Sequence, residues 1–228
     1  MSFGFPGSAV IPQIQQRIRE ATDKHVLVFA AASNDGNNQD PPIAYPAREE
    51  GVFAIGSTDS FGMPSPFSPP PQHNDSNFAT LGEGVNSAWP KRLGGPMRIM
   101  SGTSVACPIG AALAALILDY AREQPKIKDP SLFSQYGCMR LALSKMAGKS
   151  KLDYKYLAPW KLLWDQSTRA GRKGVIENLE TIMHSFTRPT FDIFLPQVVC
   201  NQLLIYSASS LHNNADRSTG SSRIQRSN

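Results

Sequence analysis

Three hydroxyl side chains stand directly before the most apolar stretch of the chain. Ser101, Thr103 and Ser104 precede a run from Ala111 to Leu118 that has no polar position, and Pro108 lies where the first turn of a helix tolerates proline. Backbone N–H groups and the helix dipole at such an end favour developing negative charge. Ser104 is therefore a candidate nucleophile for attack on a carbonyl group. The alternative is an ordinary helix cap, a common role of serine and threonine.

A second candidate, Asn34, follows a short apolar run. Residues 25–32 are typical of a strand buried on both faces of a parallel sheet, and residues 33–38 form a turn-rich loop. A side-chain amide at the C-terminal end of such a strand can donate to the oxygen of a tetrahedral intermediate, and the Ser104 backbone N–H could supply a second donor. The alternative is a turn asparagine that tolerates a positive φ.

The elements that must position these side chains alternate between helix and strand. Apolar residues recur every three or four positions from Ile11 to Ala21, which predicts a helix capped by Ser8, and residues 51–56 form a second apolar strand. This order favours an α/β doubly wound sheet. The helix near residues 107–122 is apolar on nearly every face, so we expect it to be buried all round. The side chains expected in the core are Val28, Ile55, Leu113, Leu116 and Ile117.

The segment Gly102-Thr103-Ser104-Val105-Ala106-x-Pro108 resembles the nucleophile motif of the subtilisin-like serine proteases, the subtilases. Other pieces follow in subtilase order. Met1-Ser2-Phe3-Gly4 resembles the family's Ser-x-Gly strand, and Ala31 to Gly36 resembles the segment that bears the oxyanion-hole asparagine. The resemblance covers about residues 1–125. It implies a three-layer subtilisin-like fold with a mostly parallel sheet, truncated at its N-terminal side and followed by an irregular C-terminal extension.

The resemblance also implies an activity and its residues. These are proteolysis through an acyl-enzyme, with Ser104 as nucleophile and Asn34 in the oxyanion hole. Ser33 stands where the family usually has glycine, so we expect a substrate pocket that prefers small or medium apolar side chains. The expected walls of the substrate pocket are Ser2, Phe3, Gly4, Ala31, Ala32 and Ser33.

A serine nucleophile needs a general base and a group that orients the base. Subtilases supply these from an Asp motif and a His-Gly-Thr segment, and neither pattern occurs in this sequence. None of the four histidines, His25, His73, His184 and His212, is followed by Gly-Thr. We therefore expect this chain alone to be inactive, with an upstream domain or fragment supplying the Asp and His. The alternative is a non-catalytic pseudo-protease, or a truncated binding or regulatory module.

Composition excludes some classes of protein. The 228 residues have a net charge of +5 without a dense basic stripe, which argues against nucleic acid as a partner. The three widely spaced cysteines fit reduced thiols in a cytoplasmic protein, and the first residues lack the pattern of a signal peptide. No apolar run is long enough to predict a membrane span, and no acidic cluster predicts a metal site. We expect no cofactor and a peptide or protein substrate.

The same sequence features divide the chain into three parts. We expect a partial subtilase (peptidase) domain over residues 1–125 and a helical extension packed on it over residues 126–168. Residues 169–228 become polar and rich in serine, which predicts a poorly defined, partly disordered tail.

Overall fold

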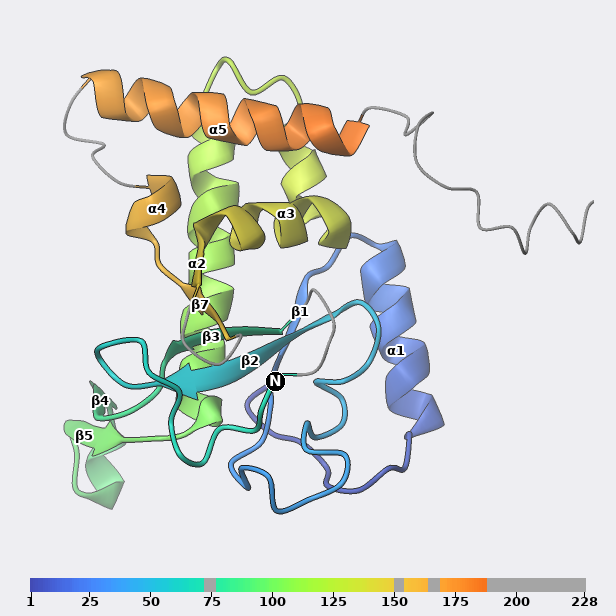
Figure 1. Ribbon diagram of the computed structural model, residues 1–228, viewed down its shortest axis with the longest axis vertical. Coiled ribbons are helices and arrows are strands. Elements are labelled where there is room, and N and C mark those ends of the chain that lie inside the picture. Colours follow the sequence, from blue (N-terminus) through green and yellow to red (C-terminus); the bar gives the residue numbers. More distant parts are fainter. Residues whose placement is uncertain (72–76, 150–153, 164–168, 188–228) are drawn as a thin grey trace, which may run out of the picture. The chain divides into compact units, whose positions relative to one another are not determined.

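The computed structural model describes residues 1–71, 77–149, 154–163 and 169–187. Residues Met1–Thr187 form one compact unit (Figure 1). Its α-helices are α1 (Pro12–Asp23), α2 (Thr103–Glu123), α3 (Tyr136–Met146), α4 (Trp160–Leu163) and α5 (Arg169–Thr187). Its strands are β1 (Val28–Ala31), β2 (Val52–Thr58), β3 (Asn77–Leu81), β4 (Val85–Ala88), β5 (Met97–Met100), β6 (Ala147–Lys149) and β7 (Lys155–Leu157). Two short 3-10 helices, η1 (Lys91–Leu93) and η2 (Pro130–Ser134), complete the described elements.

A five-stranded sheet in the order β1-β2-β3-β7-β6 forms the middle layer. Strands β1, β2, β3 and β7 run parallel, and β6 pairs antiparallel with β7. Every residue of β2 is buried, as expected for a central strand covered on both faces. The α/β class with a mostly parallel sheet is thus confirmed.

Alternation along the strands gives the sheet two apolar faces. Phe29, Phe53 and Phe78 join the larger core cluster on the side of α2, and the Phe29 and Phe53 rings stack with centroids 4.8 Å apart. Ala30 and Ala54 point to the opposite face, where they join the cluster that contains Ile18 of α1. The sheet therefore lies between α2 on one side and α1 on the other, as the three layers of the predicted fold require.

Helix α2 is buried on one side only. Leu113 and Ile117 pack into the core at 8% and 0% exposure, but Leu116 is 54% exposed, and Val28 is half-buried. Pro108 and Ala112 are exposed on the same side of α2 as Leu116. Our expectations that α2 is buried all round and that Leu116 is a core residue are therefore wrong. The sheet covers one face of this helix. On the other face, Pro108 and Ala112 line a pocket with the β4–β5 hairpin, and Leu116 is left exposed.

By length and composition, α2 could also cross a membrane. From the sequence, we predicted no membrane span anywhere in the chain. Among the described residues, α2 is the one helix of this kind. In the structure it packs against β1, β2 and β3, which is the environment of a core helix.

The C-terminal side of the unit differs from the prediction in two places. Residues 126–168, expected to form a helical extension, also supply β6 and β7 to the central sheet. Residues 169–187, expected to belong to an irregular tail, form α5. Val175, Leu179, Ile182 and Met183 recur at helical spacing and are buried, so α5 has an apolar face to pack on α3. Residues 188–228 of the predicted tail lie outside the described residues. At the other end of the chain, Ile11 rather than Ser8 caps α1, because Pro12 begins that helix.

Candidate active site

The turn between β5 and α2 places Ser104 in the first turn of α2. Gly102, at the helix cap, has φ 153°, a conformation that side chains rarely adopt. A Cβ atom there would lie 3.1 Å from the Ser104 Oγ and 3.4 Å from the Asn34 Nδ2. The Gly102 N–H donates to the Gly82 carbonyl oxygen at 2.8 Å, which ties the turn to the end of β3. Glycine at position 102 therefore brings the Ser104 hydroxyl and the Asn34 amide close together.

Thr103 fixes the orientation of the Asn34 side chain. The Thr103 backbone N–H and its Oγ1 hydroxyl donate to the Asn34 Oδ1 at 2.8 and 3.0 Å. A backbone N–H can only donate, so the atom that it contacts must be the amide oxygen. Because Thr103 is buried and Asn34 is exposed, both hydrogen bonds hold the amide oxygen inward and leave the Nδ2 as a donor beside Ser104.

The first turn of α2 offers a second donor. The Val105 and Ala106 N–H groups donate to the Gly102 carbonyl, and the Thr103 N–H donates to Asn34. The Ser104 N–H is the remaining donor of this turn, since the first N–H groups of a helix lack partners within the helix. Two donors next to a serine hydroxyl can stabilise an oxyanion that forms on a carbonyl attacked by that hydroxyl.

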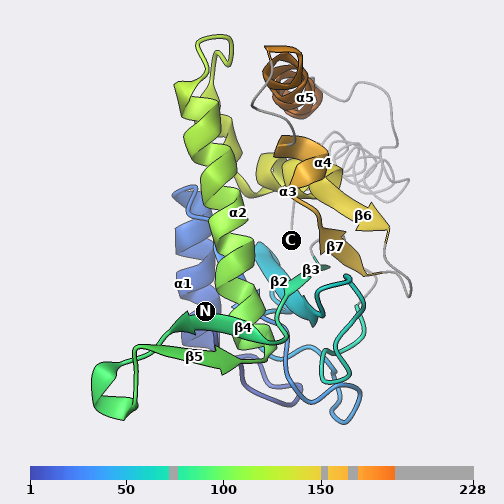
Figure 2. The same ribbon diagram turned by 90° about the vertical axis from the view of Figure 1, so that its left-hand side faces the viewer.

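Ser104 lies between two pockets. One, of about 290 Å³, is also lined by Asn34 and Thr103. It includes five of the six residues that we expected to wall the substrate pocket, namely Ser2, Phe3, Gly4, Ala31 and Ser33. The other, of about 390 Å³, lies between α2 and the hairpin of β4 and β5 and does not include Asn34. Figure 2 shows this hairpin beside the N-terminal end of α2.

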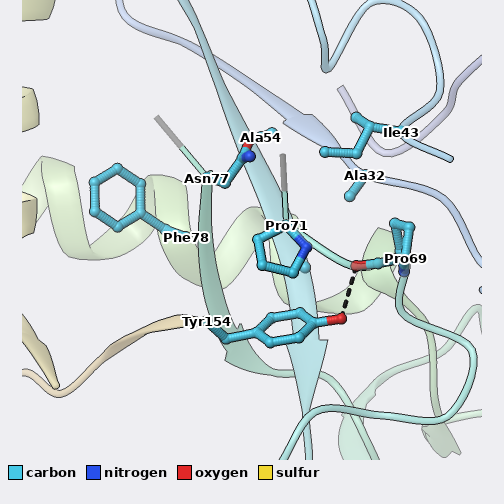
Figure 3. Close-up of a pocket in the computed structure, with 9 residues that line it drawn as sticks. Ala32, Ile43, Ala54, Pro69, Pro71, Asn77, Phe78 and Tyr154 are labelled. Carbon is cyan, nitrogen blue, oxygen red and sulfur yellow. Dashed lines mark hydrogen bonds between the residues drawn. The ribbon is translucent and has the colours of Figure 1, made fainter. Parts of the chain in front are cut away.

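Ala32, the sixth expected wall residue, lies elsewhere. It is buried on the α1 side of the sheet and lines the small cavity of Figure 3. This cavity has a volume of about 10 Å³, which suits one water molecule rather than a substrate. The Tyr154 hydroxyl beside it donates to the Pro69 carbonyl at 2.8 Å, and burial raises the pKa of Tyr154. Ala32 faces the other side of the sheet because successive side chains of a strand point to opposite faces.

Ser33 adopts φ 154°, which is unusual for a residue other than glycine. Three hydrogen bonds hold its hydroxyl. The Ser33 Oγ donates to the Asp35 Oδ2 at 3.0 Å, and it accepts from the Asp35 N–H at 3.2 Å and the Gln39 Nε2 at 2.8 Å. The loop after β1 thus replaces the glycine usual in the family with a serine fixed by its neighbours.

No histidine of the described residues lines either pocket beside Ser104. His25 is exposed in the turn before β1, whereas Asn34 follows the end of that strand, and His184 is exposed on α5. His73 and His212 lie outside the described residues. Within the part of the chain that the structure describes, no group of His, Cys, Asp and Glu side chains could hold a metal ion.

Cys107 lies one helical turn from Ser104 but is not an alternative nucleophile. It is buried, and its Sγ donates to the Met1 carbonyl at 3.6 Å. Burial raises the pKa of the Cys107 thiol, and the thiolate is the reactive form of cysteine. Among the side chains near the end of α2, the Ser104 hydroxyl is therefore the one suited to attack a carbonyl.

Comparison with known proteins agrees with this geometry. The family model of the subtilase family matches residues 1–144, somewhat beyond the 125 residues over which we recognised the motifs. The chain is 32% identical over 139 residues to the "Major intracellular serine protease" of Bacillus subtilis (strain 168), a match that covers 59% of this chain and 41% of that protein. It is 30% identical over 178 residues to the "Intracellular serine protease" of Paenibacillus polymyxa, covering 75% of this chain and 52% of that protein.

Two solved structures share the fold. The self-cleaved protease domain of PatA has a TM-score of 0.59 and 25% identity, and the match covers 79% of this chain and 61% of that one. The prenylagaramide maturation protease PagA has a TM-score of 0.60 and 22% identity, with 77% of this chain and 60% of that one covered. The chain thus spans about half the length of the curated relatives that it matches. By its family match, its motifs and its fold, the chain belongs to the subtilase family.

Proposed function

We propose that the chain is the nucleophile-bearing part of a subtilisin-like serine endopeptidase. The Ser104 Oγ attacks the scissile carbonyl carbon and its proton passes to a general base, while the carbonyl π electrons move to the oxygen. The Asn34 Nδ2 and the Ser104 N–H donate to this oxyanion. When the oxyanion collapses, the amine leaves with the proton from the base. Water then hydrolyses the acyl-enzyme and frees the Ser104 hydroxyl.

The observation that carries this proposal is the pair of hydrogen bonds from Thr103 to the Asn34 Oδ1. A turn asparagine would need no such restraint, and a plain helix cap at Ser104 would need no amide beside it. The backbone N–H and the hydroxyl of one buried residue hold the asparagine amide with its donor atom next to the adjacent serine. The arrangement thus supports an oxyanion hole over the two structural alternatives for Asn34 and Ser104.

We further propose that the general base and its orienting carboxylate come from an upstream domain or fragment that is not part of this chain. The base must reach the Ser104 Oγ from the side opposite the oxyanion donors. Asn34 lines only one of the two pockets beside Ser104, so the pocket between α2 and the β4–β5 hairpin is the place for an imidazole. This chain alone then does not turn over peptide bonds at an appreciable rate.

The proposal extends to organisation and location. Residues 1–125 would be the partial peptidase domain, and residues 126–168 the extension packed on it, which adds β6 and β7 to the same sheet. The names of two intracellular bacterial relatives support a cytoplasmic location. The substrate would be a peptide or protein, as for proteases in general.

The second candidate function is a non-catalytic module that binds peptides or regulates another protein. Both described histidines are exposed and neither lines a pocket beside Ser104, which favours this alternative for the chain acting alone. The two candidates differ in one respect, because only the first requires Ser104 to react when a base is supplied.

Complementation distinguishes the two candidates. The full chain is mixed with the separately produced N-terminal part of the Bacillus subtilis relative, and cleavage of a fluorogenic peptide library is followed. The protease proposal predicts cleavage by the mixture, none by either part alone, and none when the chain carries Ser104→Ala. Cleavage that survives Ser104→Ala would contradict the role of Ser104. A mixture that forms a stable complex without cleaving any peptide would favour the non-catalytic module.

A further inference from the structure

The pocket of about 290 Å³ beside Ser104, which is also lined by Asn34, includes three polar side chains from the loop after β1. Ser33, Asp35 and Gln39 all line it, together with residues of the N-terminal segment and the start of α2. Of these three, our sequence analysis assigned only Ser33 to the pocket. From its size alone, Ser33 predicts a preference for small or medium apolar side chains. The hydrogen bonds of this loop indicate a different preference for the bound side chain.

The donors of these three side chains are used within the loop. The Ser33 hydroxyl donates to the Asp35 Oδ2, and the two hydrogens of the Gln39 Nε2 go to the Ser33 Oγ and the Pro42 carbonyl at 2.8 and 3.0 Å. Serine has one hydrogen to donate and an amide nitrogen has two. None of the three side chains has a donor left for a ligand.

Acceptors remain in this pocket. Asp35 is exposed, and the bond from Ser33 uses one lone pair of its carboxylate, which has two oxygens and about four acceptor sites. The carbonyl oxygen of the Gln39 side chain is a further acceptor. The described residues that line the pocket include no lysine, arginine or histidine. Apart from the two oxyanion donors at Asn34 and Ser104, the pocket thus has one negative charge and acceptors without matching donors on its loop side chains, in a chain whose net charge is +5.

From this imbalance we infer that the pocket binds a cationic side chain, that of lysine or arginine, on the peptide residue whose carbonyl Ser104 attacks. An ammonium or guanidinium group brings only donors and a positive charge, which match the carboxylate and the amide oxygen. Asp35 is the residue that confers the preference. Ser33 and Gln39 are positioning residues that hold the carboxylate in place. The inference rests on the proposed function, because the reacting carbonyl defines which peptide residue enters this pocket.

Equilibrium binding tests the inference on the full chain without any need for turnover. Three fluorescein-labelled tetrapeptides of one sequence end in lysine, norleucine or glutamate, and their dissociation constants are measured by fluorescence anisotropy at low salt. Norleucine has nearly the length of lysine without its charge. We expect the lysine peptide to bind about tenfold more tightly than the norleucine peptide, the gain of one hydrogen bond to a charged group. The glutamate peptide should bind most weakly.

Three variants assign the preference to a residue. Asp35→Asn should make the lysine and norleucine peptides bind equally, and Asp35→Glu, which keeps the charge, should restore most of the difference. Asp40→Asn is the matched control, because Asp40 is an exposed carboxylate of the same loop that does not line the pocket. It should leave the tenfold preference unchanged. Circular dichroism spectra verify that each variant is folded.

The outcomes separate this inference from the proposed function. Equal binding of the lysine and norleucine peptides, tighter binding of norleucine, or a lysine preference that survives Asp35→Asn would overturn the inference alone. Failure of every peptide to bind would overturn it together with the peptide groove of the proposed function. A lysine preference lost in Asp35→Asn and also in Asp40→Asn would indicate the overall charge of the loop, and would overturn the role of Asp35.

Discussion

Two adjacent residues of α2 provide a stringent test of the fold that holds Ser104. Ile117 is 0% exposed, whereas Leu116 is 54% exposed on the face of α2 that is turned away from the sheet. Truncating either residue to alanine removes a similar amount of side chain from the same helix. The pair therefore isolates the effect of burial.

The expected magnitudes follow from these exposures. Ile117→Ala removes about three buried carbon groups at about 0.8 kcal/mol each and leaves a cavity, so it should lower the free energy of unfolding by about 3–4 kcal/mol. In Leu116→Ala, the side chain is about half exposed, so about half of this burial free energy is lost, and no cavity forms. The better helix propensity of alanine has little further effect, since leucine is nearly as good, and the expected loss is about 1 kcal/mol.

Urea denaturation followed by circular dichroism measures both values on the full chain. The slope of each transition should match that of the unmodified chain, so that the shift in midpoint reports stability. A loss for Leu116→Ala as large as that for Ile117→Ala would refute the open face of α2. It would mean that another part of the protein, or a second copy of it, covers that face in solution.

Three further predictions concern the site and its surroundings. Gly102→Ala should abolish Ser104-dependent cleavage in the complemented enzyme, because the new methyl group would lie 3.1 Å from the Ser104 Oγ in a strained backbone conformation; cleavage at the unmodified rate would refute the geometry of the turn. Thr103→Val should reduce kcat/KM about tenfold through loss of one hydrogen bond to Asn34, whereas Thr103→Ser should retain most of it, as peptide cleavage assays can measure. Burial, and to a smaller extent the charge of Asp129, raise the pKa of Cys138 from 9.0 to about 12. The folded state therefore holds this proton longer than the unfolded state, and stability should fall from about pH 9 to pH 12; urea midpoints should fall less steeply with pH in Cys138→Ala, and equal slopes would contradict the shift.

The central elements of the fold could be predicted from sequence because their signals are local. Strand β1 and residues 52–56 of β2 have no polar position to place in solvent, so a parallel sheet covered on both faces was the natural prediction. Ser104 and Asn34 could be singled out as candidates because Asn34 follows the run that forms β1 and Ser104 precedes the apolar run of α2. The structure then brought the two close together around Gly102.

The parts that could not be predicted depend on how elements far apart in the sequence pack against one another. The composition of α2 shows that it is apolar, but not whether a second layer covers the face that contains Leu116. Thr103 was read as part of a motif, and only the fold shows that its two donors converge on Asn34 across 69 positions of sequence. Ala32 was assigned to the substrate pocket with its neighbours, although alternation along β1 sends it to the other face. The hydrogen bonds of Ser33, on which the proposed preference for a cationic side chain rests, depend on a loop conformation that spacing does not determine.

The most direct test of the account is the reaction of Ser104 with a fluorophosphonate probe. The full chain and its Ser104→Ala variant are incubated with the probe near neutral pH, with and without the N-terminal part of the Bacillus subtilis relative, and the labelled residue is identified by mass spectrometry. We predict slow labelling of the chain alone, because the hydroxyl lacks a base, and rapid labelling in the complemented mixture, confined to Ser104. Rapid Ser104-dependent labelling of the chain alone would contradict the requirement for an outside base. Labelling of a residue other than Ser104 in the mixture would contradict the assignment of the nucleophile itself.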